Sequence, residues 1–243
     1  MCTLTVVTRE DGYLAGMNRD EKIIRGSGFS PGVYELHRRR AIYPEDGNGG
    51  TWIGVNQYGV SLALLNWNQV VPGVLDTSKH SRGQIIPALL GSASLAELES
   101  ALGILDLKTI LPFRMVGVFP GEKEIREWRW DSIQTDFLVH AWEGRHWFSS
   151  SLSDQQAASL RGNICREARK ESDAGSETWL RRLHASHAGG AGAFSVCVHR
   201  RDVETLSYSE ITCNPTRVRM NHSIGNSCAM GLLDEIQLER SAM

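Results

Sequence analysis

The sequence predicts a layered α+β domain in which helices cover a pair of antiparallel sheets. Short segments with alternating apolar and polar residues recur along the chain between turn residues, a pattern typical of antiparallel strands. Two blocks with apolar residues at helical spacing separate these runs of strands. Because each strand or helix must bury its apolar face against another element, this order favours helices packed on sheets.

Composition excludes several classes of protein. The 243 residues, 41% of them hydrophobic, are enough for one domain spanning residues 1–243. A net charge of -2 gives no general attraction to nucleic acid or to an anionic membrane. No apolar stretch approaches the roughly 18 residues of a membrane-spanning helix. The five cysteines include no Cys-x-x-Cys pair, which is typical of a reducing compartment. We therefore expect a cytoplasmic protein without a transmembrane segment, and the sequence leaves a homo-oligomer open.

The strand predictions rest on alternation and on turn residues. Asp11-Gly12 is a turn signal between the first two strands, because this pair readily adopts the positive φ angles of a tight hairpin. Residues 25–50 are polar and rich in Gly and Pro, so we expect an irregular connection there with one short strand. The predicted strands are Cys2 to Thr8, Tyr13 to Met17, Val33 to His37, Trp52 to Val55, Val60 to Leu65, Phe113 to Phe119, Ile125 to Trp130, Asp136 to His140, Phe194 to His199, Glu204 to Tyr208 and Arg217 to His222.

Two helical blocks are expected between these strands. Gln84 to Leu90 and Leu95 to Leu105 have apolar residues at helical spacing, and Ser94 followed by Glu97 is a capping-box pattern. Residues 154–187 are predicted to be helical with a break near Gly175. The Gly/Ala segment 188–193 that follows is expected to be a loop.

Cys2 is the most informative single residue. Removal of the initiator Met would leave a thiol and a free α-amine on the same residue, and this amine, with an ordinary pKa near 8, could accept the thiol proton. One residue would then supply both nucleophile and general base. The alternative from position alone is a small, inert residue buried in a strand.

Four motifs in the first third of the chain resemble the NRDE family, the homologues of Transport and Golgi organisation protein two. They are Met1-Cys2-Thr3, Asn18-Arg19-Asp20-Glu21, the segment Gly54 to Val60 continuing to Leu65-Asn66, and Ser81-Arg82-Gly83. Their order and spacing are specific together, whereas each alone is weak. One departure is Ser150, which stands where NRDE relatives commonly have an asparagine.

The same region is also similar to the choloylglycine hydrolase and penicillin V acylase group of N-terminal-nucleophile hydrolases. That group has a Cys at this position and an Asn-x-Asp on the second strand, which Asn18 and Asp20 match. Met17 departs from the arginine that precedes this motif in the group. The resemblance implies a four-layer αββα sandwich of antiparallel sheets.

The resemblance also implies roles for particular residues in hydrolysis of a small-molecule amide. Cys2 would be the nucleophile, Asp20 would orient its α-amine, Arg19 would help to build the site, and Asn66 would donate to the oxyanion, as a side-chain amide can. We place Asn18 and Arg82 in the binding site. Strand alternation puts Asn18 and Asp20 on one face and Arg19 on the other.

A second function remains open from the same resemblance. Members of the NRDE family are implicated in haem trafficking and lipid homeostasis, so haem is a candidate transported ligand for a hydrolase scaffold without turnover. A metal centre is not expected. Cys197 and His199 share a face of a predicted strand and could approach Cys213, but core packing is the commoner reason for such a pattern.

Overall fold

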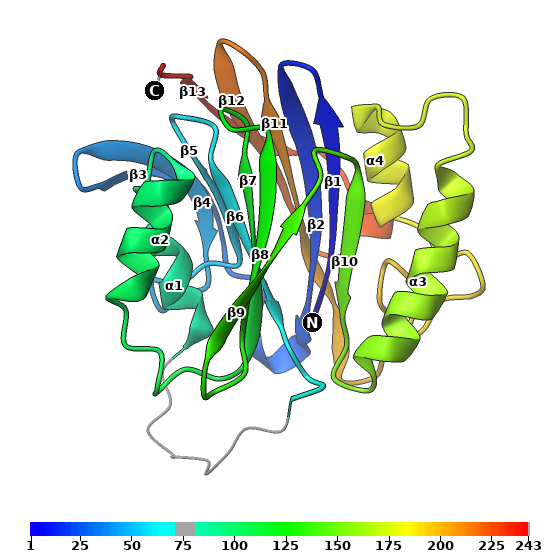
Figure 1. The fold of residues 1–243 in the computed structure, drawn as a ribbon. Coiled ribbons are helices and arrows are strands. Elements are labelled where there is room, and N and C mark those ends of the chain that lie inside the picture. Colours follow the sequence, from blue (N-terminus) through cyan, green and yellow to red (C-terminus); the bar gives the residue numbers. More distant parts are fainter. Residues whose placement is uncertain (71–80, 243) are drawn as a thin grey trace.

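A computed structural model describes residues 1–70 and 81–242, and two antiparallel sheets form its centre (Figure 1). The six-stranded sheet has the order β10 (Arg145–Ser149), β1 (Cys2–Arg9), β2 (Gly12–Lys22), β11 (Val203–Cys213), β12 (Arg217–Ile224) and β13 (Asp234–Glu239). The seven-stranded sheet runs in chain order through β3 (Phe29–Leu36), β4 (Arg39–Glu45), β5 (Ile53–Asn56), β6 (Ser61–Asn66), β7 (Phe113–Phe119), β8 (Glu124–Trp130) and β9 (Thr135–His140).

Helices cover both outer faces of this pair of sheets, which gives the expected four-layer αββα sandwich (Figure 1). The helices α1 (Ile85–Leu89) and α2 (Leu95–Gly103) pack on the seven-stranded sheet, and α3 (Asp154–Ala168) and α4 (Glu177–His184) pack on the other. None of the helices in the described ranges has the length and apolar character needed to span a bilayer.

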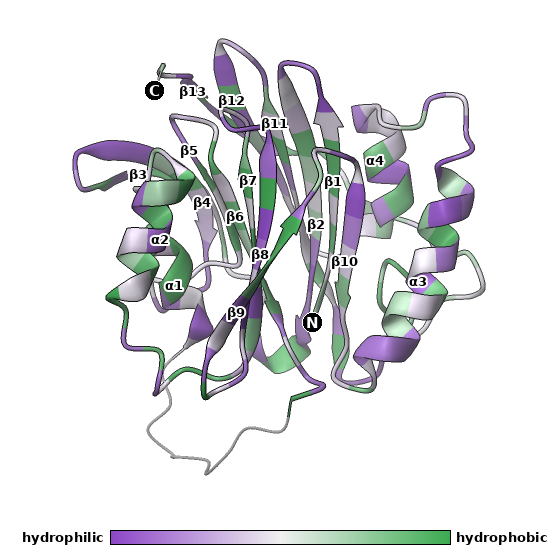
Figure 2. Cartoon of the chain, viewed as in Figure 1, coloured by the Kyte–Doolittle hydropathy of each residue, from purple (hydrophilic) through white to green (hydrophobic). Residues whose placement is uncertain are grey.

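Three apolar clusters hold the layers together. The largest lies between the two sheets, and the other two lie under the helix pairs. In Figure 2 the central strands carry many green apolar residues, whereas α3 carries many purple hydrophilic ones. Burial at about 25 cal/mol per Å² of apolar surface makes these interlayer clusters the main source of stability.

The predicted hairpin and helix starts are confirmed. β1 and β2 pair in register from Cys2 opposite Arg19 to Arg9 opposite Gly12. Ser94 caps α2 by accepting a hydrogen bond from the Glu97 N–H at 3.3 Å. The Glu97 carboxylate reaches back to the N–H of Ala93, one residue before the position that a capping box usually uses.

Several predictions of local structure are wrong. The segment Phe194 to His199 forms only isolated bridges, from Val198 to Gly192 and from His199 to Glu204. Residues 25–50, expected to be mostly irregular, instead contain the β3–β4 hairpin. The strands β10 and β13 were not predicted, and β2 extends five residues beyond its predicted end at Met17.

Candidate active site

Cys2 begins β1, which lies between the edge strand β10 and β2 in the six-stranded sheet. It pairs with Arg19 of β2 on one side and with Ser149 of β10 on the other, and only 5% of its surface is exposed. Its main-chain N–H donates to Ser149 Oγ at 2.9 Å. The nitrogen that would become the α-amine is therefore already held in place.

Met1 continues the pairing of β1 with β2 by one residue. Its terminal amine donates to the main-chain oxygen of Asp20 at 2.8 Å, and the Asp20 N–H donates back to the Met1 oxygen at 2.8 Å. The Met1 side chain packs against Val198 and Val203. In this form the amine belongs to Met1, and Cys2 is an internal residue.

A cavity of about 320 Å³ opens beside Cys2. The structure brings together here five of the six site residues suggested by the sequence, although they come from β1, β2, β6 and the short 3₁₀ turn η2 (Arg82–Gln84). These five are Cys2, Arg19, Asp20, Asn66 and Arg82. Trp52, Leu64 and Leu111 add apolar lining, and Glu21, Arg25 and Asp46 add charge.

Arg19 and Cys2 share one face of the sheet, because directly paired residues of neighbouring strands point the same way. The Arg19 guanidinium lies 4.5 Å from the centroid of the Trp52 ring and donates to the main-chain oxygen of Gly26 at 3.0 Å. This face is turned toward the second sheet, so the Cys2 thiol and the Arg19 charge border the same interlayer cavity.

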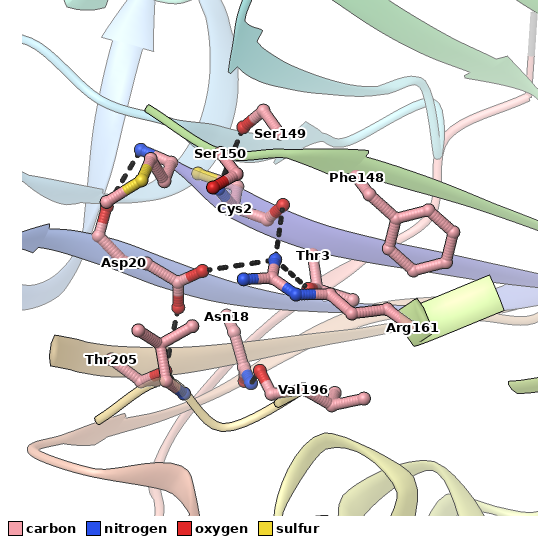
Figure 3. A network of polar contacts seen from close by, with 12 residues as sticks. Cys2, Thr3, Asn18, Asp20, Phe148, Ser149, Ser150, Arg161, Val196 and Thr205 are labelled. Carbon is pink, nitrogen blue, oxygen red and sulfur yellow. Dashed lines mark hydrogen bonds and ion pairs between the residues drawn. The ribbon is translucent and has the colours of Figure 1, made fainter. Parts of the chain in front are cut away.

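The Asp20 carboxylate points to the other face of the sheet, toward α3 (Figure 3). Its two oxygens receive a hydrogen bond from Thr205 at 2.7 Å and an ion pair from Arg161 at 3.4 Å. A β-bulge in β11 lies beside this contact, between Thr205 and Ser207. The carboxylate is thus held from the helix layer, and it is the Asp20 main chain that touches the N-terminal amine.

Arg161 is a site residue that the sequence interpretation missed. It lies on α3 with no exposed surface, and it donates to Thr3 Oγ1 at 2.8 Å and to the Cys2 carbonyl at 3.4 Å as well as to Asp20. A signal was present, since Arg161 occupies the buried face of α3 that Ala157 and Cys165 also share at four-residue spacing.

Asn18 lies outside the cavity lining. Its side-chain amide is fully buried and donates to the main-chain oxygens of His184 and Val196, each at 2.9 Å. These bonds tie β2 to the end of α4 and to the segment after the Gly/Ala loop. Asn18 and Asp20 do share a face of β2, as alternation predicts, and both connect the strand to the helix layer.

Burial dominates the electrostatics of the site. It raises the pKa of the Cys2 thiol, and the nearby terminal amine only partly opposes this effect. Burial also raises the pKa of Asp20, against the attraction of Arg161 and of the amine. The pKa values of Arg19 and Arg82 are lowered by burial, with the Glu21 carboxylate acting in the opposite direction.

The comparisons with solved structures agree with this architecture. The C2A mutant of conjugated bile acid hydrolase from Clostridium perfringens matches with a TM-score of 0.57 at 11% identity, over 97% of this chain and 92% of that one. Penicillin V acylase from Agrobacterium tumefaciens matches with a TM-score of 0.56 at 11% identity, over 98% and 86%. This chain has the N-terminal-nucleophile hydrolase fold. No family model and no curated protein matches its sequence.

Within this N-terminal-nucleophile fold, the raised pKa of Cys2 leads to a testable expectation for protein that retains a residue ahead of it. Because a raised pKa leaves less thiolate at a given pH, Cys2 should react with iodoacetamide more slowly at pH 7 than free cysteine does. The rate should rise with pH through a midpoint above the ordinary thiol value of about 8.5. Peptide mass spectrometry identifies the labelled residue, and a midpoint below that value would contradict the buried environment.

Proposed function

We propose that the chain hydrolyses a non-peptide amide bond of a small molecule, with Cys2 as an N-terminal nucleophile after removal of Met1. The observation that carries this proposal is the position of Cys2, at the start of β1, where it borders a cavity shared with Arg19, Asn66 and Arg82. We also propose membership of the NRDE family, on the motifs around Cys2, Asn18 to Glu21 and Asn66.

Removal of Met1 would free main-chain hydrogen-bonding groups of Asp20 beside the new α-amine of Cys2. The Cys2 nitrogen would keep Ser149 Oγ as a partner, and the main-chain N–H and C=O of Asp20 would lose their Met1 partners beside it. The buried Asp20 carboxylate and Arg161 would fix this part of β2 from the opposite face. The amine would then be positioned by the strands on both sides of Cys2.

The reaction would proceed through a thioester. The α-amine takes the thiol proton, and the thiolate attacks the amide carbonyl carbon to form a tetrahedral oxyanion, to which Asn66 donates. As the C–N bond breaks, the ammonium returns the proton to the leaving amine. Water then attacks the thioester with the same amine as base, which releases the acid and restores the thiol.

The arginines without an ion-pair partner in the described part of the chain favour a substrate with a carboxylate, although the carboxylates of Glu21 and Asp46 also line the cavity. Three arginines line it, and only Arg25 has an ion-pair partner among the described residues, Glu21 at 3.2 Å. Arg19 and Arg82 are held through main-chain oxygens, which leave donors for a planar anion. Trp52 and the neighbouring leucines would contact the apolar part of the acyl group.

The decisive experiment compares two forms of one protein. Intact mass identifies a chain that begins at Cys2, and an N-terminally tagged chain supplies the control in which Cys2 stays internal. Each form is incubated with a panel of N-acyl amino acids while released amine is measured. Because the control lacks the general base, its rate should be lower by about 10²–10⁴-fold. Equal rates in the two forms would refute the N-terminal mechanism, and a saturable haem titration without any amine release would favour haem binding.

Asn66 offers a further test of the same site. Replacing Asn66 with alanine removes the side-chain donor while leaving the main-chain pairing of β6 and β7 in place. Loss of one oxyanion donor typically costs about 10²–10³ in kcat, so we expect a fall of this size with little change in KM. Steady-state kinetics check this, and an unchanged kcat would remove Asn66 from the proposed reaction.

A further inference from the structure

Four side chains with metal-binding atoms meet outside the candidate active site. They are His187, which follows α4, Cys197 and His199 from the bridged segment after the Gly/Ala loop, and Cys228 in the 3₁₀ turn η3 (Ser227–Ala229). One ligand atom from each lies within 4.8 Å of all the others. None of the four lines the cavity beside Cys2.

The distances in this cluster fit a tetrahedral zinc ion. With Zn–S near 2.3 Å and Zn–N near 2.0–2.1 Å, a tetrahedral site separates a sulfur from a nitrogen ligand by about 3.5–3.6 Å. The Sγ atoms of Cys197 and Cys228 each lie 3.5 Å from His199 Nε2. Both sulfur–nitrogen separations to His199 therefore already match the spacing that zinc imposes.

His187 supplies an independent indication of a ligand. Its Nε2 atom is shielded from solvent, yet it has no hydrogen-bond partner among the residues that the structure describes. Its ring approaches that of His199 at 4.8 Å between centroids and 65° between planes, so the two rings meet edge to face. A buried ring nitrogen without a partner costs free energy, which metal coordination would recover.

We propose that His187, Cys197, His199 and Cys228 form a closed Cys₂His₂ zinc site. Two thiolates and two neutral imidazoles are a ligand set that zinc prefers, and four protein ligands leave no open position for a substrate. Binding of Zn²⁺ releases the two thiol protons to solvent and forms a neutral complex. The site is structural in kind, and no step of the proposed hydrolysis uses it.

The position of the site explains what such an ion would stabilise. It joins the segment 187–199, which has little regular structure, to η3. The same segment supports β2, since the Val196 oxygen accepts from Asn18 and the Val198 N–H donates to Thr205 Oγ1, which in turn donates to Asp20. Zinc would thus hold the loop that supports the carboxylate behind Cys2.

Metal analysis of the full chain, purified without chelators under reducing conditions, tests the proposal. We expect one zinc per chain by elemental analysis. After exchange with Co²⁺, we expect intense visible d–d bands of tetrahedral cobalt and near-ultraviolet thiolate-to-cobalt charge transfer. Cys228→Ser should weaken Zn²⁺ binding by more than the roughly 10–100-fold that follows loss of a group supporting a ligand. Cys228 is exposed, so this variant should fold, which far-ultraviolet circular dichroism verifies.

Two controls separate the site from nonspecific binding. Cys165→Ala removes a buried thiol under α3, and His37→Asn removes an exposed imidazole in the β3–β4 turn, and both variants should keep the metal and the cobalt spectrum. The proposal is overturned if the reduced chain binds no zinc, or if Cys228→Ser binds it as tightly as the parent. It is also overturned if intact mass shows the loss of two hydrogens to a Cys197–Cys228 disulfide under these conditions.

Discussion

Cys2→Ala is expected to reduce the proposed amide hydrolysis by at least about 10⁴-fold, because it removes the atom that would form the thioester. The α-amine, the cavity and the pairing of β1 would remain. The Cys2 side chain is nearly buried and small, so the fold should survive the loss of one sulfur atom. Amine release under saturating substrate measures the effect, and thermal unfolding verifies the fold.

Cys165→Ala is the matched control for this loss. Cys165 is also a buried free cysteine, but it lies in the apolar cluster under α3, where burial raises its pKa to about 12. Its replacement should leave turnover unchanged. Turnover that survives in Cys2→Ala would place the chemistry in another part of the molecule.

The layered fold was predictable because its signals are local. Alternating apolar residues and the Asp11-Gly12 turn identified the first hairpin, and Ser94 with Glu97 marked the start of α2. The β3–β4 hairpin was missed for the opposite reason. Its turn places His37 and Arg38 at φ angles of 53° and 65°, which a sequence normally signals with Asn or Gly.

The candidate site was only partly predictable. Cys2, Arg19 and Asp20 lie on one hairpin, so their proximity follows from β pairing. Asn66 reaches the cavity from β6 of the second sheet and Arg82 from the turn η2, and only the resemblances to known families connected them with Cys2. The spacing of residues along the chain does not show which parts of the two sheets face each other.

The cluster of cysteines and histidines could not be predicted from the spacing of these residues along the sequence. Sequence spacing made Cys213 a candidate partner of Cys197 and His199, but Cys213 lies on β11 in the core between the sheets. The structure instead brings Cys228 and His187 to them. Because these ligands come from three segments, their separations match no compact zinc motif.

Arg161→Met is expected to lower the free energy of unfolding by about 3–5 kcal/mol, because it leaves the buried Asp20 carboxylate without its charge partner. Arg161 and Asp20 both have no exposed surface, so water cannot replace the lost interaction. Arg166→Met, on the exposed side of the same helix, should change stability by less than about 0.5 kcal/mol. Urea unfolding of both variants measures the difference.

The decrease in the free energy of unfolding caused by Arg161→Met should depend on pH. Burial already raises the pKa of Asp20 in the folded protein, and removal of Arg161, its strongest opposing charge, should raise this pKa further. A carboxyl group with a raised folded pKa makes stability fall as pH rises from the unfolded value, near 3.9, through the folded value. The deficit of the variant should therefore be largest at neutral pH and shrink toward pH 4.

The double variant Arg161→Met with Asp20→Asn identifies the cause of the loss. Asparagine keeps the size of Asp20 and can still accept from Thr205, but it carries no buried charge. Much of the deficit at neutral pH should then disappear, together with its pH dependence, giving a coupling energy of at least about 1 kcal/mol between the two positions. Additive losses would instead mean that Arg161 acts through its bonds to Thr3 and the Cys2 carbonyl, and that the charge on Asp20 is balanced by other groups.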